Sequence, residues 1–397
     1  MPFVRNFILI SLLGLAIFVA GCSGENKATE KEQSETQTSS KQDKKEPYKI
    51  GAVLRLSKGA SDGVPARIGT ELAVNMINSS GGINGRKLEI IYYDSKDDAT
   101  TAVNAVQKLI SVDEVQAIVG PMMSGNVLAA APLCERSQVV MITPTGTSPR
   151  ITEAGEYIFR ICSRIDLQAK ALVEKALEMN EEKNPKVAII YSNEPYGKGC
   201  KKLFSKYLAE QDIQPAAVES FQRGDKDFQA QLTKIESLSP DILFIPGYLQ
   251  ETAPLISQAR QMGIDALSVG VFGDMAPLYV ELAGKAGEGH LIAGEYDRDY
   301  QTQINSRFKS AYEKRLQGDT DVPDNIMFAS LGFDSVRMLA EAFQQGATSG
   351  PEIKDYLDSL EDFNGVTGKL SFDSNGDVKK GGVYLFQVMD GKYEKIN

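Results

Sequence analysis

Residues 115–144 contain two short apolar runs separated by a stretch of helix length, and this pattern limits the folds open to the chain. The runs are VQAIVG and VVMITP, and the amphipathic segment between them begins at Ser124. A strand, a helix and a second strand of these lengths predict a right-handed βαβ unit with parallel strands. Open α/β sheets bind ligands just past the carboxyl ends of such strands.

Hydroxyl groups follow both predicted strands. Ser124 comes after the first strand, and the turn Thr145-Gly146-Thr147 comes after the second. The unpaired N–H groups and positive dipole end of a helix N-terminus favour an anion, and nearby hydroxyl donors suit a carboxylate. The alternative is that these Ser and Thr residues only cap helices. We therefore treat these four residues as candidate ligand contacts.

Composition argues against several functional classes. The chain has 397 residues, enough for more than one domain, and a net charge of −10 without a basic, aromatic-rich patch, which disfavours nucleic acid as a partner. The single histidine, His290, lies in the Gly-rich segment GKAGEGHL, and we expect it in a surface loop. An enzyme built on a histidine is therefore disfavoured.

Motifs for metals, cofactors and hydrolysis are missing from the sequence. The four cysteines show no CxxC or Cys/His spacing, so we expect no metal site. GPMMSG differs from the G-x-S-x-G nucleophile elbow, and no segment matches a nucleotide-binding loop. We expect a protein that is not an enzyme and has no cofactor. We expect the segment DSNGD to form a turn, because its Gly stands one residue too early for the EF-hand calcium-loop pattern.

The first 47 residues differ in character from the rest. Residues 1–21 combine Arg5 with an apolar core too short for a membrane span and predict an export signal. VAGC, ending at Cys22, resembles the bacterial lipoprotein processing box, which implies a lipid on the Cys22 thiol; a free surface Cys is the alternative. Residues 22–47 have almost no apolar side chains and predict a disordered tether.

Two series of strand and helix patterns begin at Tyr48 and after Ile151. They predict parallel sheets covered by helices on both faces. Three further helices follow, and the chain closes in a hairpin-like pair of strands joined through Asn375-Gly376. In the second series the loops after strands carry conspicuous polar or aromatic side chains, namely Tyr196, Tyr248, Phe272 and Asp274. Two such series predict two lobes that face each other across a cleft.

The segments KIGAVL, GGINGRKLEIIYYD, VGPMMS, MITPTGTSP, YGKG and FNGVTGKLSFDSNGD, together with the lipoprotein box, resemble the leucine/isoleucine/valine-binding family of extracytoplasmic solute-binding proteins. The resemblance extends over the whole body from Tyr48 to Ile396. It implies the type I periplasmic-binding, or Venus flytrap, fold: two Rossmann-like α/β lobes joined by three hinge crossings. Lobe 1 would comprise residues 48–163 and 295–371, and lobe 2 residues 164–294 and 372–397.

The resemblance also implies roles for individual residues. Hydroxyl and N–H groups of Ser124, Thr145 and Thr147 would hold the α-carboxylate of a ligand. Tyr196 and Tyr248 would wall the pocket, and Asp62 would lie at the first βα turn. No family disulfide is obvious among Cys134, Cys162 and Cys200; we expect Cys134 to be buried and inert.

Two positions depart from the family pattern. Phe272 stands where family members that bind amino acids usually place an acid for the α-ammonium. Either Asp274, two residues on, reaches into the pocket, or the ligand is not a simple α-amino acid. Arg55 stands in the first turn where small residues are usual. Turned inward it would match a second acidic group; otherwise it is a solvated charge at the rim.

The function implied by the resemblance is that of a receptor for an ABC importer. Its ligand would be a small carboxylate, such as a branched-chain amino acid or an amide, delivered to permease and ATPase subunits in the membrane. We expect an exported monomer anchored by lipid in the periplasm or at the cell surface. The alternative is a ligand sensor of the same fold that reports to a signalling partner.

Overall fold

A parallel five-stranded sheet organises the first part of the computed structural model, which describes residues 46–57, 60–318 and 322–397. The strand order is β2-β1-β3-β4-β5, so β1 lies between β2 and β3. Its strands are rich in buried Val, Ile and Ala, as expected for a sheet covered on both faces. The bounds are β1 Tyr48–Leu54, β2 Leu88–Asp94, β3 Ala117–Val119, β4 Val140–Thr143 and β5 Ile158–Arg160.

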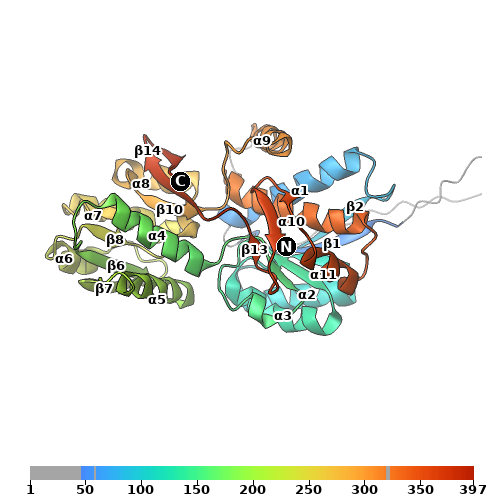
Figure 1. The fold of residues 1–397 in the computed structure, drawn as a ribbon, viewed down its shortest axis with the longest axis horizontal. Coiled ribbons are helices and arrows are strands. Elements are labelled where there is room, and N and C mark those ends of the chain that lie inside the picture. Colours follow the sequence, from blue (N-terminus) through green and yellow to red (C-terminus); the bar gives the residue numbers. More distant parts are fainter. Residues whose placement is uncertain (1–45, 58–59, 319–321) are drawn as a thin grey trace, which may run out of the picture. The chain divides into compact units, whose positions relative to one another are not determined.

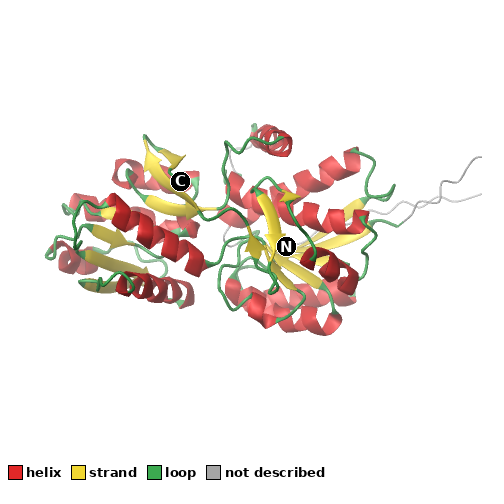
Figure 2. Ribbon diagram, viewed as in Figure 1, coloured by secondary structure: helices red, strands yellow, loops and turns green. Residues whose placement is uncertain are grey.

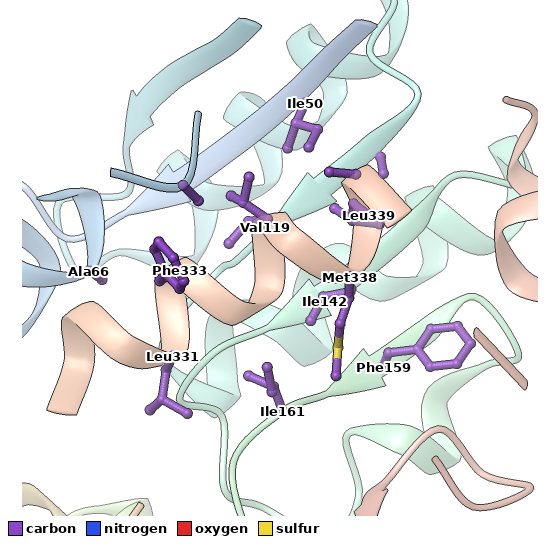
Figure 3. Close-up of a cluster of buried hydrophobic side chains, with 14 of the residues drawn as sticks. Ile50, Ala66, Val119, Ile142, Phe159, Ile161, Leu331, Phe333, Met338 and Leu339 are labelled. Atoms are coloured by element: carbon purple, nitrogen blue, oxygen red, sulfur yellow. The ribbon is translucent and has the colours of Figure 1, made fainter. Parts of the chain in front are cut away.

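Helices cover both faces of this sheet (Figure 1). One face carries α1 (Ala60–Ser79), α9 (Gln303–Leu316), α10 (Ile326–Gln344) and α11 (Gly350–Asp358), and the other carries α2 (Ala99–Ser111) and α3 (Ser124–Ser137). Figure 3 shows side chains of α10, such as Phe333 and Leu339, beside Val119 and Ile142 of the sheet. All residues of α10 except Arg337, Glu341 and Gln344 are buried, so this helix is enclosed on nearly all sides.

Close contact between α1 and α10 depends on glycine. A Cβ atom built on Gly69 would lie 1.8 Å from the carbonyl oxygen of Ala329, and one on Gly332 would lie 2.4 Å from that of Ala66. Both distances are far below van der Waals contact, so neither position has room for a side chain. These two glycines therefore allow the two backbones to approach each other.

A seven-stranded sheet organises the second part, in the order β15-β14-β10-β9-β8-β6-β7. The strands are β6 (Val187–Ser192), β7 (Ala217–Phe221), β8 (Ile242–Phe244), β9 (Leu267–Val269), β10 (Leu291–Gly294), β14 (Tyr384–Met389) and β15 (Lys392–Lys395). The helices α4 (Ile165–Met179) and α5 (Pro195–Ala209) cover one face, and α6 (Gln229–Glu236), α7 (Leu249–Gln261) and α8 (Pro277–Ala283) the other. Figure 2 shows the alternation of strands and helices in both sheets.

Three segments connect the two sheets: residues 161–164, 295–302 and 380–383. We call the five-stranded sheet with its helices and the small sheet β11 (Phe363–Asn364), β12 (Lys369–Phe372) and β13 (Val378–Lys379) lobe 1. The seven-stranded sheet with its helices is lobe 2. This is the type I periplasmic-binding architecture that the sequence predicts. The predicted residue bounds of the lobes stay a prediction, because residues 44–397 form a single contact unit.

Most predicted elements are present, and three details differ. The C-terminal region forms two hairpins where one was predicted: β12 pairs with β13 around Asn375-Gly376, and β14 pairs with β15 in the other sheet. The short elements α8 and β10 were missed. The prediction that His290 lies in a surface loop is wrong, because its side chain is fully buried next to β10.

The prediction that Cys134 is buried is confirmed. Cys134, Cys162 and Cys200 are free and buried, and burial raises the pKa of the Cys134 thiol to about 12. The export signal, Cys22 and nearly all of the tether lie outside the described residues. Among the residues that are described, no helix is both long and apolar enough to cross a membrane.

Candidate functional site

The start of α3 and the turn after β4 meet at the carboxyl edge of the first sheet. The Ser148 N–H donates to the Oγ of Ser124 at 3.2 Å, and the Thr145 hydroxyl donates to the carbonyl oxygen of Met122 at 2.9 Å. A hydrogen bond from the Gly146 N–H to the Thr143 hydroxyl, 3.1 Å, fixes the turn. The structure thus brings together the hydroxyl residues that the βαβ pattern singled out.

Glycine at the end of β3 makes this arrangement possible. Gly120 has a φ of 93°, in the region that favours glycine. A Cβ atom there would lie 2.2 Å from the carbonyl oxygen of Val53 in β1. The chain can therefore turn sharply from β3 into α3 and deliver Ser124 to the edge of the sheet.

Several N–H groups at this edge have no partner within the described residues. Ser124, Gly125 and Asn126 form the first turn of α3, where a helix leaves its N–H groups unpaired. The N–H groups of Thr145 and Thr147 likewise donate to no other described residue. Such a group of donors at the positive end of a helix suits a carboxylate.

Tyr196 and Tyr248 form an aromatic pair in lobe 2. Their ring centroids are 5.3 Å apart, and the ring planes are tilted by 38°. The side chain of Glu194 caps α5 by accepting from the Tyr196 N–H at 2.9 Å, which fixes the first turn of that helix. Tyr196 is the second residue of α5, whereas Tyr248 is the N-cap residue of α7. Burial raises the pKa of both hydroxyls well above the usual value, so both tyrosines are neutral donors.

Arg223, which the sequence reasoning missed, lies over the ring of Tyr248. Its guanidinium carbon is 4.0 Å from the ring centroid, and its Nε is 3.5 Å from Glu251. After burial, the charges of Glu194, Arg223, Arg55 and Asp97 act most on the pKa of Tyr248. Two of these groups, Arg55 and Asp97, belong to lobe 1. The sequence could have indicated Arg223, because it follows the predicted strand β7 just as Tyr196 and Tyr248 follow β6 and β8 of the same sheet.

Arg55 is buried at the end of β1, with 6% of its surface exposed. Its Nη1 is 2.5 Å from Asp62 and its Nη2 is 3.0 Å from Asp97. The alternative of a solvated rim charge is therefore wrong. Asp97 was also missed; it lies in the loop after β2, where Lys96 and Asp97 both have positive φ angles. Burial outweighs the attraction of Arg55 and raises the pKa of Asp62 to about 6.

Phe272 and Asp274 contact different parts of the molecule. Phe272 is 4% exposed and packs edge-on against Phe328 of α10, with centroids 5.4 Å apart. Asp274 is fully buried and accepts from the hydroxyl of Thr252 at 2.7 Å, while its Oδ2 is 3.6 Å from the Nε2 of His290. Burial raises the pKa of Asp274. Its Oδ2 has no hydrogen-bond partner among the described residues, so the expectation that Asp274 reaches a bound ligand stays a prediction.

These groups are hydrogen-bond donors and one ion cluster. In residues 46–57, 60–318 and 322–397, no three His, Cys, Asp or Glu side chains come together as they would around a metal ion. The candidate site offers a set of N–H and hydroxyl donors on one lobe, two tyrosines on the other, and the ion cluster of Arg55, Asp62 and Asp97 beside them.

Comparison with known families gives one match over nearly the whole body. The family model described as "Periplasmic binding protein" matches residues 47–392. Among curated proteins, a leucine-, isoleucine-, valine-, threonine- and alanine-binding protein of Pseudomonas aeruginosa is 29% identical over 316 residues, which cover 79% of this chain and 82% of the relative.

Solved structures of similar proteins give the same family assignment. The branched-chain amino acid transporter substrate-binding protein LivJ of Streptococcus pneumoniae, in complex with isoleucine, superposes with a TM-score of 0.79 at 30% identity; the match covers 88% of this chain and 99% of that one. The leucine-binding protein LivK of Thermotoga maritima has a TM-score of 0.78 at 28% identity, with 88% and 98% of the two chains covered.

Proposed function

Since the chain belongs to the periplasmic binding protein family, we propose that it is the extracytoplasmic receptor of an ABC importer. Its ligand is a small carboxylate, of the branched-chain amino acid or amide type, bound between the lobes. Binding shifts the population toward a closed form that delivers the ligand to the permease. Two similar proteins support this ligand class: one is named for binding leucine, isoleucine, valine, threonine and alanine, and the other is a branched-chain amino acid transporter protein in complex with isoleucine.

One observation carries the proposal: unpaired N–H groups and hydroxyls converge where β3 and β4 end. The Ser148 N–H donates to the Oγ of Ser124 and the Thr145 hydroxyl donates to the carbonyl oxygen of Met122, so hydrogen bonds hold the start of α3 and the segment after β4 in a fixed geometry before a ligand arrives. Fixed donors reduce the entropy lost on binding. In this proposal Ser124, Thr145, Gly146 and Thr147 hold the carboxylate, and Tyr196 and Tyr248 close over the rest of the ligand.

The test is isothermal titration calorimetry on the full-length protein in mild detergent, with leucine, isoleucine, valine and glutamine as ligands. Ser124→Ala combined with Thr147→Ala removes two hydroxyls from the carboxylate site. Hydrogen bonds to charged groups contribute about 1.5–3 kcal/mol each, so we expect Kd to rise by about 100-fold or more. The control combines Thr233→Ala and Ser237→Ala, exposed hydroxyls of α6 and its end. An unchanged Kd in the first double variant would refute the site.

We also propose that the protein is exported and held at the membrane as a monomer through a lipid on Cys22. Tyr48, where β1 begins, lies 26 residues beyond Cys22, so the segment between them is long enough to act as a tether. Cys22→Ala should move the protein from the membrane fraction to the soluble fraction, and intact-mass spectrometry should show the loss of a diacylglyceryl group. A variant that stays in the membrane fraction with unchanged mass would exclude this anchor.

A further inference from the structure

Three consecutive carbonyl groups of the turn after β4 are held by the end of β5 and the start of α4. The carbonyl oxygen of Gly146 accepts from Nη1 of Arg160 at 3.3 Å, and that of Ser148 accepts from the same nitrogen at 2.6 Å. Between them, the carbonyl oxygen of Thr147 accepts from the backbone N–H of Ile165, the first residue of α4, at 3.0 Å. Two elements outside the turn therefore fix its acceptor side.

The position of the Gly146 carbonyl decides where the next N–H points. In a trans peptide the C=O and N–H bonds point in opposite directions, so the N–H of Thr147 points away from Arg160. This N–H donates to no other described residue. The neighbouring N–H of Ser148 donates to the Oγ of Ser124, so the donor side of the turn faces the start of α3. The acceptor side and the donor side of the turn are thus separated.

Glycine at position 146 makes this peptide unit easy to rotate. Gly146 has no side chain that restricts its backbone angles. A half-turn of the Gly146-Thr147 peptide would put a carbonyl oxygen where the Thr147 N–H now lies. The hydrogen bond from Arg160 to the Gly146 carbonyl opposes that rotation.

The two ends of the Arg160 guanidinium have different partners. Arg160 is the last residue of β5 and has no exposed surface. Its Nη2 donates to Oδ1 of Asp377 and, at 3.3 Å, to the hydroxyl of Thr152. The Thr152 hydroxyl donates in turn to Oδ1 of Asp377 at 2.9 Å. Nη2 therefore carries the ion pair, and Nη1 holds the carbonyl groups of the turn.

The turn predicted from the segment DSNGD supplies Asp377. Oδ1 of Asp373 accepts from the N–H groups of Asn375 and Asp377, at 2.9 and 3.0 Å. The backbone N–H of Arg160 donates to the carbonyl oxygen of Gly376 at 2.9 Å, so this turn lies directly against the end of β5. The counter-ion of the guanidinium is therefore held in a fixed place.

We propose that Arg160 is a positioning residue of the carboxylate site. Through Nη1 it keeps the carbonyl oxygens of Gly146 and Ser148 away from the ligand, and it leaves the Thr147 N–H free to donate to the carboxylate. Arg160 itself does not touch the ligand. Without it, the peptide is free to rotate and to bring a carbonyl oxygen against the negative charge. This inference rests on the proposed function, because it takes the turn after β4 to hold the ligand carboxylate.

Arg160→Lys separates the two tasks of the guanidinium. A lysine keeps the charge for Asp377 but has a single nitrogen, which cannot replace both ends of the planar guanidinium. The measurement is calorimetry on the full-length protein in mild detergent, with leucine, isoleucine, valine and glutamine. Because hydrogen bonds to a charged group are strong, we expect Kd to rise at least tenfold for every ligand that binds the wild type. An unchanged Kd in a folded Arg160→Lys protein, checked by circular dichroism, would overturn the inference.

Hydrogen exchange followed by mass spectrometry shows whether the effect arises at the turn. The tightest ligand of the panel, at saturation, should slow exchange of the Thr147 N–H in the wild type, resolved by fragmentation of a peptide that contains residues 144–149. In Arg160→Lys at saturation we expect this protection to be lost, while the exchange of the start of α5 stays as in the liganded wild type. A purely structural role would change both segments alike. A wild type whose Thr147 N–H gains no protection would overturn the inference, and this result decides if the variant does not fold.

Asp334→Asn is the matched control for loss of stability. Asp334 is a buried carboxylate of lobe 1, and its hydrogen bonds go to Val366 and Thr367, so its replacement disturbs the lobe without touching the turn. We expect its Kd to stay within twofold of the wild-type value. A rise as large as that in Arg160→Lys would overturn the inference, because general loss of packing would then explain both.

The same titrations separate this inference from the proposed function. If the Ser124→Ala, Thr147→Ala variant binds weakly and Arg160→Lys binds like the wild type, the carboxylate site stands and only the positioning role falls. If no ligand of the panel binds the wild type, the proposed function itself falls and takes this inference with it.

Discussion

The backbone N–H of Ser163 donates to Oε1 of Glu295 at 3.0 Å, and this bond joins two of the three segments that connect the lobes. The same carboxylate also accepts from Lys380 of the third segment, and from Gln168 of α4 at 3.3 Å. Glu295 is 1% exposed. One buried carboxylate therefore ties all three crossings to each other.

Removing the charge of Glu295 should leave Lys380 buried without a counter-ion. Breaking a buried ion pair from one side costs about 3–5 kcal/mol, so we expect Glu295→Gln to lower the free energy of unfolding by about that amount. Urea denaturation followed by circular dichroism measures the change. Combining Glu295→Gln with Lys380→Met should recover most of the loss, because no unpaired charge remains. A single variant that loses less than ~1 kcal/mol would contradict this account.

Asp334 of α10 forms hydrogen bonds with the loop after β11. Its carboxylate accepts from the N–H groups of Val366 and Thr367 at 3.0 and 2.9 Å, and from the Thr367 hydroxyl at 2.9 Å. Asp334→Asn turns an acceptor into a donor that faces other donors. We expect a loss of about 1–3 kcal/mol in unfolding free energy. Glu361→Gln is the control, because Glu361 is exposed and accepts no hydrogen bond from another described residue, so its change should cost less than ~1 kcal/mol. Equal losses would contradict the assignment.

The sequence predicts the fold well because its signals are local. Apolar runs of strand length alternate with amphipathic helices, and caps such as Asp98, which accepts from the Thr101 N–H at 2.7 Å, mark the helix starts. The convergence of Ser124 with the 145–147 turn follows from parallel strands alone. These inferences need no knowledge of which distant residues touch.

Where prediction failed, contacts between distant residues decide the outcome. His290 lies among glycines, a local sign of a loop, but its ring stacks on Tyr279 at 4.6 Å and its Nδ1 is 3.0 Å from the Ser268 hydroxyl. Arg55 is buried because Asp97, 42 residues later, neutralises it together with Asp62. No pattern within a window of the sequence contains such pairings.

Gly69 should not tolerate a side chain. A Cβ atom at this position would overlap with the backbone of Ala329, and that backbone cannot move without separating α1 from α10. We expect Gly69→Ala to lower the unfolding free energy by about 1–3 kcal/mol or more, measured by urea denaturation. Gly199→Ala in α5 is the matched control, because a Cβ atom there meets nothing within 4 Å. Alanine is the better helix former by about 1 kcal/mol, so this control should be neutral or stabilising. A destabilised Gly199→Ala together with a neutral Gly69→Ala would reverse the argument.

Glu352 links the stability of α11 to pH. Its carboxylate accepts from the N–H groups of Ser349 and Thr348, both at 2.9 Å, and these bonds lower its pKa from 4.5 to about 2. A folded-state pKa below the unfolded value means that the stabilisation is complete above pH 4.5 and is lost as the pH falls toward 2. Glu352→Gln should therefore lower Tm at pH 7, and its deficit relative to wild type should shrink between pH 4.5 and 3. Differential scanning calorimetry at pH 7, 4.5 and 3 measures this difference in Tm.

Glu361→Gln is the control. Glu361 is an exposed acid that accepts no hydrogen bond from another described residue, so its change should leave Tm unaltered at each pH. A deficit of the same size at pH 7 and pH 3 would show that the Glu352 charge does not hold the helix start.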